Sequence, residues 1–120
     1  MGLRQALSRW ASSAEELEAE ALQDDAEEVG ATRCCDLPDR EPARVCGTLR
    51  TVTVRPRAGV PALEAELYDG SGVVSVVWLG RRRIPGIDPG RGVVAEGRVT
   101  RDHGRAVIFN PRYTLLPGSR

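Results

Sequence analysis

The most constraining feature of the sequence is a series of short segments, between residues 43 and 116, in which apolar and polar residues alternate. The clearest is Leu63-Glu64-Ala65-Glu66-Leu67, and the other segments are rich in Val and Thr. A period of two sends successive side chains to opposite faces of a strand, so each segment predicts a strand with one buried face. β-branched residues favour the same structure. Because Gly- and Pro-rich stretches separate the segments, the region predicts a small all-β body.

Five strands are expected in this body. They cover residues 43–54, 63–68, 73–79, 93–100 and 105–109. An extension of the fifth strand past Asn110-Pro111 to Leu116 is left open. Residues 55–61 are expected to form a loop, and residues 69–72 a tight hairpin turn. The longest connection, residues 80–92, joins the third strand to the fourth, and this order predicts a five-stranded Greek-key barrel.

Residues 1–30 have the pattern of an acidic α-helix. Apolar residues recur at spacings of four and three on one helical face: Leu3, Leu7, Trp10, Ala14, Leu17 and Ala21. Most other positions carry good helix formers, and Gly30 is expected to end the helix. Ser12 and Ser13 each precede a Glu by three residues, as in a capping box, which leaves open a break near Ser12 and a pair of helices.

The apolar seam of this helix has two interpretations. It docks on the barrel of its own chain, or it pairs with a partner helix or a second copy. Because the seam is short for a stable coiled coil, docking or partial disorder is favoured. The predicted organisation is an acidic helix or helix pair over residues 1–30, a linker over 31–42, a barrel over 43–116 and a tail over 117–120. Pro38 and Pro42 argue against regular structure in the linker.

The formal net charge of zero hides a division between the two parts of the chain. Residues 1–42 contain four Arg and eleven acidic residues, a balance of −7, whereas residues 43–120 contain thirteen Arg and six acidic residues, a balance of +7. This asymmetry suggests a basic body that meets polyanions and an acidic segment that shields or steers it. The alternative is that both charged surfaces only keep the protein in solution.

Several other function classes are not expected. No stretch approaches the roughly 20 apolar residues needed to cross a bilayer, and the polar amino-terminal region lacks a secretory signal, so a cytoplasmic location is expected. Cys34, Cys35 and Cys46 are expected to be reduced structural thiols. A metal site built from two of them and His103 matches no known zinc spacing, so neither metal nor cofactor is expected. His103 has no matched nucleophile, and we therefore expect a protein that is not an enzyme.

Short motifs at the joints between the strands carry a family resemblance. They are Gly47-Thr48-Leu49, Tyr68-Asp69-Gly70-Ser71-Gly72, Trp78-Leu79, Pro89-Gly90, Gly97-Arg98-Val99 and Asn110-Pro111-Arg112-Tyr113. In this order they resemble the OB-fold nucleic-acid-binding family, and within it the wedge domain of RecG branch-migration helicases and short actinobacterial proteins with the same barrel. The resemblance covers residues 43–115. The chain contains no Gly-x-x-x-x-Gly-Lys-Ser/Thr phosphate loop, so helicase activity is not implied.

The resemblance implies binding of single-stranded or junction DNA, or RNA, across the outer face of strands two and three and by two of the loops. Those loops contribute Arg55, Arg57, Arg101, His103 and Arg105. Cations that follow phosphates and flat side chains that stack on bases add further candidates. The predicted nucleic-acid-binding residues are Arg55, Arg57, Tyr68, Arg81, Arg82, Arg83, Arg91, Arg101 and Arg105.

Two features of these candidates leave alternatives open. The Arg81-Arg82-Arg83 cluster either contacts phosphate or is a solvated loop paired with Asp88 or with the acidic helix. Among the aromatic residues, Tyr68 is the best candidate for stacking on a base, Trp78 is expected in the core, Phe109 is undecided and Tyr113 is expected at the barrel end. Glu64 and Glu66 share the face of Tyr68 and repel phosphate, which predicts weak, salt-sensitive binding or a contact moved toward the loops.

The function predicted from sequence is a non-enzymatic accessory protein that binds nucleic acid, with single-stranded or branched DNA favoured. The alternative is a protein–protein interaction adaptor that uses the acidic helix and a face of the barrel. The sequence leaves open the choice between DNA and RNA, the protein partner and the oligomeric state.

Overall fold

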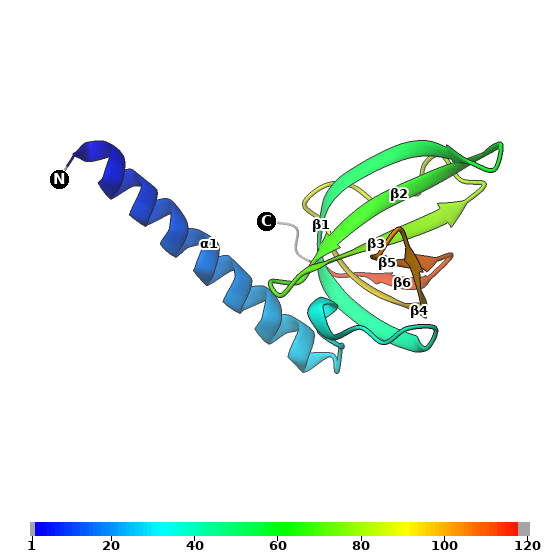
Figure 1. The fold of residues 1–120 in the computed structure, drawn as a ribbon, viewed down its shortest axis with the longest axis horizontal. Helices are drawn as coiled ribbons and strands as arrows, with labels where there is room; N and C mark the ends of the chain where they lie inside the picture. The colour runs from blue at the N-terminus through cyan, green and yellow to red at the C-terminus, as the bar shows by residue number, and fades with distance from the viewer. Residues whose placement is uncertain (1, 118–120) are drawn as a thin grey trace.

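The computed structural model describes residues 2–117, and for residues 3–10 it describes the backbone alone. One long helix precedes a β-sheet (Figure 1). The elements in chain order are α1 (Leu3–Glu28), the one-turn 3₁₀-helix η1 (Cys34–Asp36), β1 (Pro42–Arg57), β2 (Val60–Tyr68), β3 (Val73–Leu79), β4 (Gly92–Asp102), β5 (Arg105–Phe109) and β6 (Arg112–Leu115). No helix among the described residues is both long enough and apolar enough to span a membrane.

Five strands close into a barrel-like sheet. Their order is β1-β2-β3-β5-β4, and β4 pairs back to β1 to complete the ring. All of these pairings are antiparallel except that of β3 with β5, and β6 pairs with β4 along the edge opposite β1. The structure therefore confirms the expected all-β class with an N-terminal helix, and its closed, barrel-like sheet of five strands is compatible with the expected Greek-key OB barrel. The open extension of the fifth strand is a separate short strand, β6.

The hairpin between β1 and β2 is longer than the sequence predicted. The expected loop over residues 55–61 is wrong, because both strands continue through it to a two-residue turn. Ala58 and Gly59 form that turn with positive φ values of 50° and 78°, as a type I′ hairpin turn requires. Arg57 and Val60 are the hydrogen-bonded pair that closes the turn. Pro56 and Pro61 form the next pair, one position farther from the turn, and this pair is of the non-hydrogen-bonded type. Since non-hydrogen-bonded pairs need no N–H on that side, proline is tolerated there.

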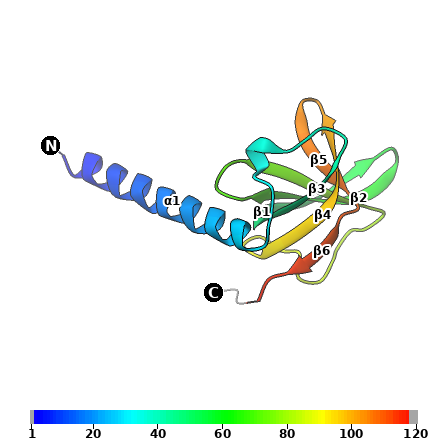
Figure 2. The ribbon, with the colours of Figure 1, turned by 90° about the horizontal axis from the view of Figure 1, so that it is seen from below.

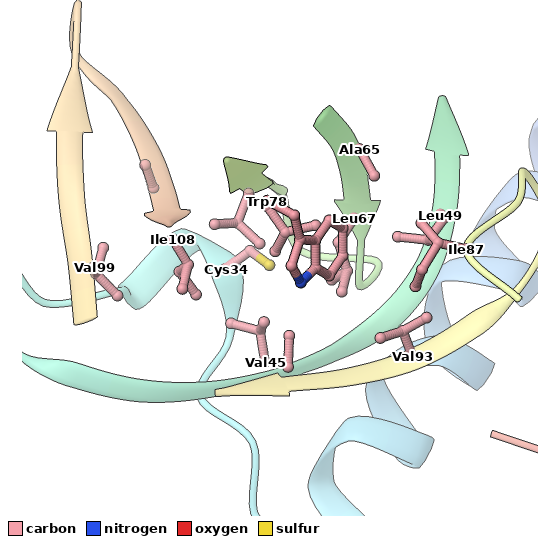
Figure 3. Packing of buried hydrophobic residues seen from close by; sticks show 14 of the residues in the cluster. Cys34, Val45, Leu49, Ala65, Leu67, Trp78, Ile87, Val93, Val99 and Ile108 are labelled. Carbon is pink, nitrogen blue, oxygen red and sulfur yellow. The ribbon is translucent and has the colours of Figure 1, made fainter. Parts of the chain in front are cut away.

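The core lies inside the ring of strands. Figure 3 shows side chains of the strands pointing into it together with residues from two connections, Cys34 of η1 and Ile87 of the β3–β4 loop. Trp78 is buried among them, as expected, and its ring meets that of Tyr113 edge-on at 5.5 Å. The Trp78 Nε1 donor has no hydrogen-bond partner among the described residues. The core therefore includes part of the segment that the sequence assigned to a linker.

Helix α1 is continuous, so the break considered near Ser12 is absent from the described helix. It ends as the sequence predicted. Gly30 has a φ of 70°, its N–H donates to the Glu27 carbonyl at 3.1 Å, and the Ala31 N–H donates to the Ala26 carbonyl at 2.9 Å. These two bonds form a Schellman motif, which satisfies carbonyls that the end of a helix leaves free.

Only the carboxyl-terminal part of α1 contacts the barrel, and the rest projects away from it (Figures 1 and 2). Ala26 is buried and Ala19 and Leu22 are half-buried, whereas the seam residue Leu17 is 66% exposed. The favoured docking of the helix through its seam is therefore wrong for the described residues. The side chains of Leu3, Leu7 and Trp10 lie outside the described residues.

A close backbone contact explains which face of α1 docks. Gly70, in the turn between β2 and β3, has a φ of 91°, and a Cβ added there would lie 2.3 Å from the Ala19 carbonyl oxygen. Only glycine permits this approach, so the helix is placed by contact of its backbone with the turn. Hydrophobic periodicity does not report such a contact.

The same turn anchors the segment that follows the helix. The Asp69 carboxylate, 1% exposed, accepts hydrogen bonds from the Cys34 N–H (2.8 Å), the Ser71 N–H (2.8 Å), the Ser71 hydroxyl (2.7 Å) and the Gly72 N–H (3.1 Å). Burial by itself would raise the pKa of Asp69, but these four bonds to the charged form outweigh it and lower the pKa below its ordinary value. Asp69 therefore ties η1 to the barrel.

Candidate functional site

A groove on the outer face of the sheet brings together side chains from three distant parts of the chain. It lies between the β1–β2 hairpin and the β4–β5 turn and has a volume of about 470 Å³. We call it the arginine groove. Its lining residues are Arg55, Pro56, Arg57, Glu64, Ser75, Asp102, His103, Arg105 and Val107. A smaller hollow of about 140 Å³ continues it along Thr51, Thr53 and Glu66.

Strand register places the three arginines on this face. Arg55 and Arg57 are two residues apart on β1, so both point outward. Arg105 begins β5 directly after a two-residue turn, His103-Gly104, in which both φ values are positive, 53° and 82°. The hairpin extension that the sequence missed lengthens β1 enough for Arg57 to reach the β4–β5 turn.

An apolar cluster lies beneath the arginines, on the outer rather than the inner face. Ala62, Val77 and Val107 are buried there, and Phe109 packs against them. The Arg57 guanidinium lies 5.3 Å from the centre of the Phe109 ring, within cation–π range. Phe109, undecided from sequence, therefore packs on the outer face and supports Arg57.

The carboxylates of the groove are paired with its arginines. Arg57 Nη1 lies 3.1 Å from an Asp102 oxygen and Arg57 Nη2 lies 3.4 Å from a Glu64 oxygen. Arg105 Nη2 lies 3.6 Å from a Glu66 oxygen. The hydrogen bond to Asp102, together with the charge of Glu64, raises the pKa of Arg57 above its ordinary value. The acidic residues that the sequence placed against phosphate are thus each engaged by an arginine.

Arg55 differs from its neighbours. It is exposed, and it forms no ion pair with any of the described residues. Three arginines and three carboxylates surround the groove and its continuation, so their formal charges cancel. An anion entering the groove would meet Arg55 directly but would compete with Asp102 and Glu64 for Arg57.

Tyr68 is far from the arginine groove. It ends β2, whereas Arg57 pairs with the first residue of that strand, and the nine residues of β2 span roughly 26 Å from end to end. The Arg50 guanidinium covers one face of its ring at 3.6 Å from the centre. Arg50 is the extra residue of an irregularity in the β1–β2 register between Leu49 and Thr51, which no local sequence signal marks.

The Arg81-Arg82-Arg83 cluster is exposed in the β3–β4 loop, and none of the three is among the described residues that line the groove. The loop begins beside the start of β2, because the Gly80 N–H donates to the Pro61 carbonyl at 2.7 Å. No ion pair joins the cluster to Asp88 or to the described acidic residues of α1. It is a solvated cluster near the same end of the barrel as the groove.

Two further predicted residues lie elsewhere and hold the chain together. Arg101 Nε lies 2.6 Å from an Asp39 oxygen, and Arg101 Nη2 donates to the Leu37 carbonyl at 3.0 Å. Arg91 Nε donates to the Leu116 carbonyl at 3.2 Å. Both side chains therefore fasten segments outside the strands of the ring. Their sequence positions, next to turns, do not reveal these distant partners.

A second basic surface was missed by sequence reasoning. Arg44, Arg98 and Arg112 line a hollow of about 430 Å³ on β1, β4 and β6, together with Glu96. Glu96 lies 3.5 Å from Arg44 Nη2 and 3.9 Å from Arg112 Nη2. The register that pairs these residues across three strands depends on the closure of the barrel, so it has no local signal in the sequence.

The three cysteines are free thiols. Burial raises the pKa of both Cys34 and Cys46, whereas Cys35 is exposed. Within the part of the chain that the structure describes, no group of three or more His, Cys, Asp or Glu side chains is arranged to hold a metal ion. His103 is exposed in the β4–β5 turn with its Nε2 3.7 Å from an Asp102 oxygen.

Comparison with known proteins identifies the fold. No family model matches the chain, and no curated protein matches its sequence. Among solved structures, it is similar to RecG bound to a three-way DNA junction, with a TM-score of 0.62 and 22% sequence identity. The similarity covers 73% of this chain and 13% of the RecG chain. The barrel is therefore a fold that also occurs within the much larger RecG.

Proposed function

We propose that this chain is an accessory module that binds single-stranded or branched DNA, or RNA, through the arginine groove and has no catalytic activity of its own. The observation that carries the proposal is the convergence of Arg55 and Arg57 of β1 with Arg105 of β5 around one concave face. Arginine suits this role because its planar fork of donors matches phosphate oxygens. The cytoplasmic location expected from the sequence belongs to the same proposal.

The charge balance of the groove sets the expected strength of binding. A phosphate that reaches Arg57 must displace Asp102 or Glu64. The free energy lost with the broken ion pair therefore offsets part of the free energy gained from the phosphate contact. Arg55 needs no such exchange and is the first contact. We therefore expect weak binding that falls steeply as salt rises, because phosphate contacts release counterions.

The arrangement of the aromatic residues favours recognition of the sugar–phosphate backbone of a nucleic acid over recognition of its bases. Phe109 is partly buried beneath Arg57, and Arg50 already covers one face of Tyr68. Base stacking, which strengthens other single-strand binders, is therefore limited here. The module should show little sequence preference. The RecG structure supports this proposal only by analogy, because one fold hosts many functions.

Fluorescence anisotropy with labelled single-stranded DNA, single-stranded RNA and a three-way junction, each at several salt concentrations, tests the proposal. Arg55→Ala should weaken binding roughly two- to fivefold at low salt, the value of one exposed charge contact. It should also reduce the slope of log K against log salt by about 0.7 on single strands. Arg112→Ala, on the second basic surface, is the matched control and should change neither quantity.

The loop cluster is tested separately by replacing Arg81, Arg82 and Arg83 together with Ala. Loss of binding in this variant with no effect of Arg55→Ala would move the contact from the groove to the loop. A loss confined to Arg112→Ala would move it to the second basic surface. Absence of binding to all three probes at low salt would reject the proposal and favour the protein-interaction adaptor.

A further inference from the structure

The sequence of helix α1 carries a regular apolar seam, and the barrel does not cover the described part of it, Ala14, Leu17 and Ala21. Positions 3, 7, 10, 14, 17 and 21 alternate spacings of four and three, the pattern of a heptad seam. Leu17 is 66% exposed, and Ala14 and Ala21 are also exposed. The barrel instead contacts the face that carries Ala19, Leu22 and Ala26. At 3.6 residues per turn, that face lies roughly 130° around the helix from the seam.

The sizes of the seam residues suit antiparallel pairing of two copies. In the register that centres the seam, the opposing positions are Trp10 with Ala14, Leu7 with Leu17, and Leu3 with Ala21. Each Trp10 position then faces a small residue, as interdigitation of large and small side chains requires. A parallel pair would instead place the two Trp10 positions in one layer and leave layers in which Ala faces only Ala.

The charges of α1 point to the same arrangement. Arg4 and Arg9 are the only charged residues among positions 2–13, whereas positions 14–28 carry eight acidic residues and no basic one. Antiparallel pairing brings the basic end of each helix beside the acidic end of the other. It sets Arg4 and Glu18 at equivalent flanking positions of the two helices. Parallel pairing would place the two acidic ends side by side, which is unfavourable.

We propose that two copies of this chain associate through antiparallel pairing of their α1 helices along this seam. The second helix ends beside Ala21, on the side of α1 away from the contact between Ala19 and Gly70 of the barrel. Ala21 and Glu18 also line the hollow of about 500 Å³ between helix and barrel, so the mouth of that hollow borders the pair. The two barrels lie at opposite ends, about 36 Å apart along the helix axis at 1.5 Å per residue.

This arrangement requires neither the arginine groove nor nucleic acid. The arginine groove of each barrel stays clear of the helices, because the β1–β2 hairpin that borders it points away from α1 (Figure 1). If the grooves bind nucleic acid, the pair holds two of them on one rigid spacer and raises the apparent affinity through effective concentration. The seam spans only about three heptads, so we expect a weak dimer whose population depends on concentration.

Sedimentation equilibrium of the full chain, from micromolar to submillimolar concentration, measures the association. Leu17→Glu should raise the dimer Kd by about tenfold or more, because a charge enters the seam twice per dimer. Leu79→Glu is the matched control: Leu79 is 43% exposed at the end of β3, away from α1, and its replacement should leave the Kd unchanged. Circular dichroism verifies that both variants remain helical.

Charge exchange tests the direction of the helices. Arg4→Glu and Glu18→Arg should each weaken association, by roughly tenfold for the two pairs of a dimer, and the double variant should restore it. Restoration distinguishes the antiparallel pair, because parallel helices do not bring positions 4 and 18 together. A chain that is monomeric at every concentration, a dimer that survives Leu17→Glu, or a double variant without rescue would each overturn the proposal. Monomeric behaviour would assign the seam to a different protein.

Discussion

Asp69 provides the sharpest test of how the helix and the following segment are held on the barrel. Its Oδ1 accepts the Ser71 N–H, the Ser71 hydroxyl and the Gly72 N–H, and its Oδ2 accepts the Cys34 N–H. In Asp69→Asn, the amide oxygen can keep the first three bonds, but the amide NH₂ then meets the Cys34 N–H, donor against donor. One buried charged hydrogen bond is lost.

The expected cost follows from that single bond. A hydrogen bond to a charged group contributes about 1.5–3 kcal/mol, so Asp69→Asn should lower the free energy of unfolding by about 2 kcal/mol at pH 7. Asp69→Ala removes the acceptor for all four donors, of which the Ser71 hydroxyl can turn to another partner. It should cost about 3–4 kcal/mol. Urea unfolding followed by circular dichroism measures both values.

The pH dependence gives an independent check. Folding lowers the pKa of Asp69 below its value of about 3.9 in the unfolded chain. The carboxylate therefore stabilises the protein fully when the pH is above the unfolded-state pKa. This contribution is lost as the pH falls through the lower pKa of the folded state. The difference in the free energy of unfolding between wild type and Asp69→Asn should therefore become smaller below about pH 4. Asp88→Asn, at an exposed position in the β3–β4 loop, is the control and should cost under about 0.5 kcal/mol. An Asp69→Asn variant as stable as that control, or a difference independent of pH, would refute the reasoning.

Two other local predictions follow from the contacts. Gly70→Ala should lower the free energy of unfolding by at least about 2 kcal/mol and speed hydrogen exchange in the last turns of α1, because the added Cβ would meet the helix backbone. Gly80 has a similar φ of 78° but open space around an added Cβ, so Gly80→Ala should lower the free energy of unfolding by only about 1 kcal/mol. Equal losses would mean that the helix contact is unimportant. A thiol reagent should modify Cys35 rapidly in the folded protein, while Cys34 and Cys46 react only on unfolding, because burial protects them and raises their pKa. Three equal native rates would contradict the packing of η1.

Local patterns carried the parts of the fold that depend on neighbouring residues. The alternation around Leu63 predicted which side chains of β2 face the core, and Gly30 predicted the end of α1. Trp78 was placed correctly in the core for the same reason. In each case, the period of a strand or the conformational freedom of a glycine acts within a few residues, so the signal survives without knowledge of the fold.

Predictions failed where a distant partner decides the outcome. Residues 55–61 looked like a loop because of two prolines, yet Pro56 and Pro61 face each other at positions that need no N–H on that side. The seam of α1 looked like a docking face, but the backbone contact at Gly70 selected another face. Neither pairing can be read from the spacing of residues along the chain.

The candidate site divides in the same way. The sequence by itself determined that the barrel is basic, that arginines flank its turns and that the helix is acidic with a seam of its own. Only the tertiary structure decided that Arg55, Arg57 and Arg105 share a groove, that Arg57 is held by Asp102 and Glu64, and that Arg91 and Arg101 hold other segments in place. The physical reason is that residue types and short periods are local properties, whereas strand register and barrel closure bring together side chains separated by tens of residues.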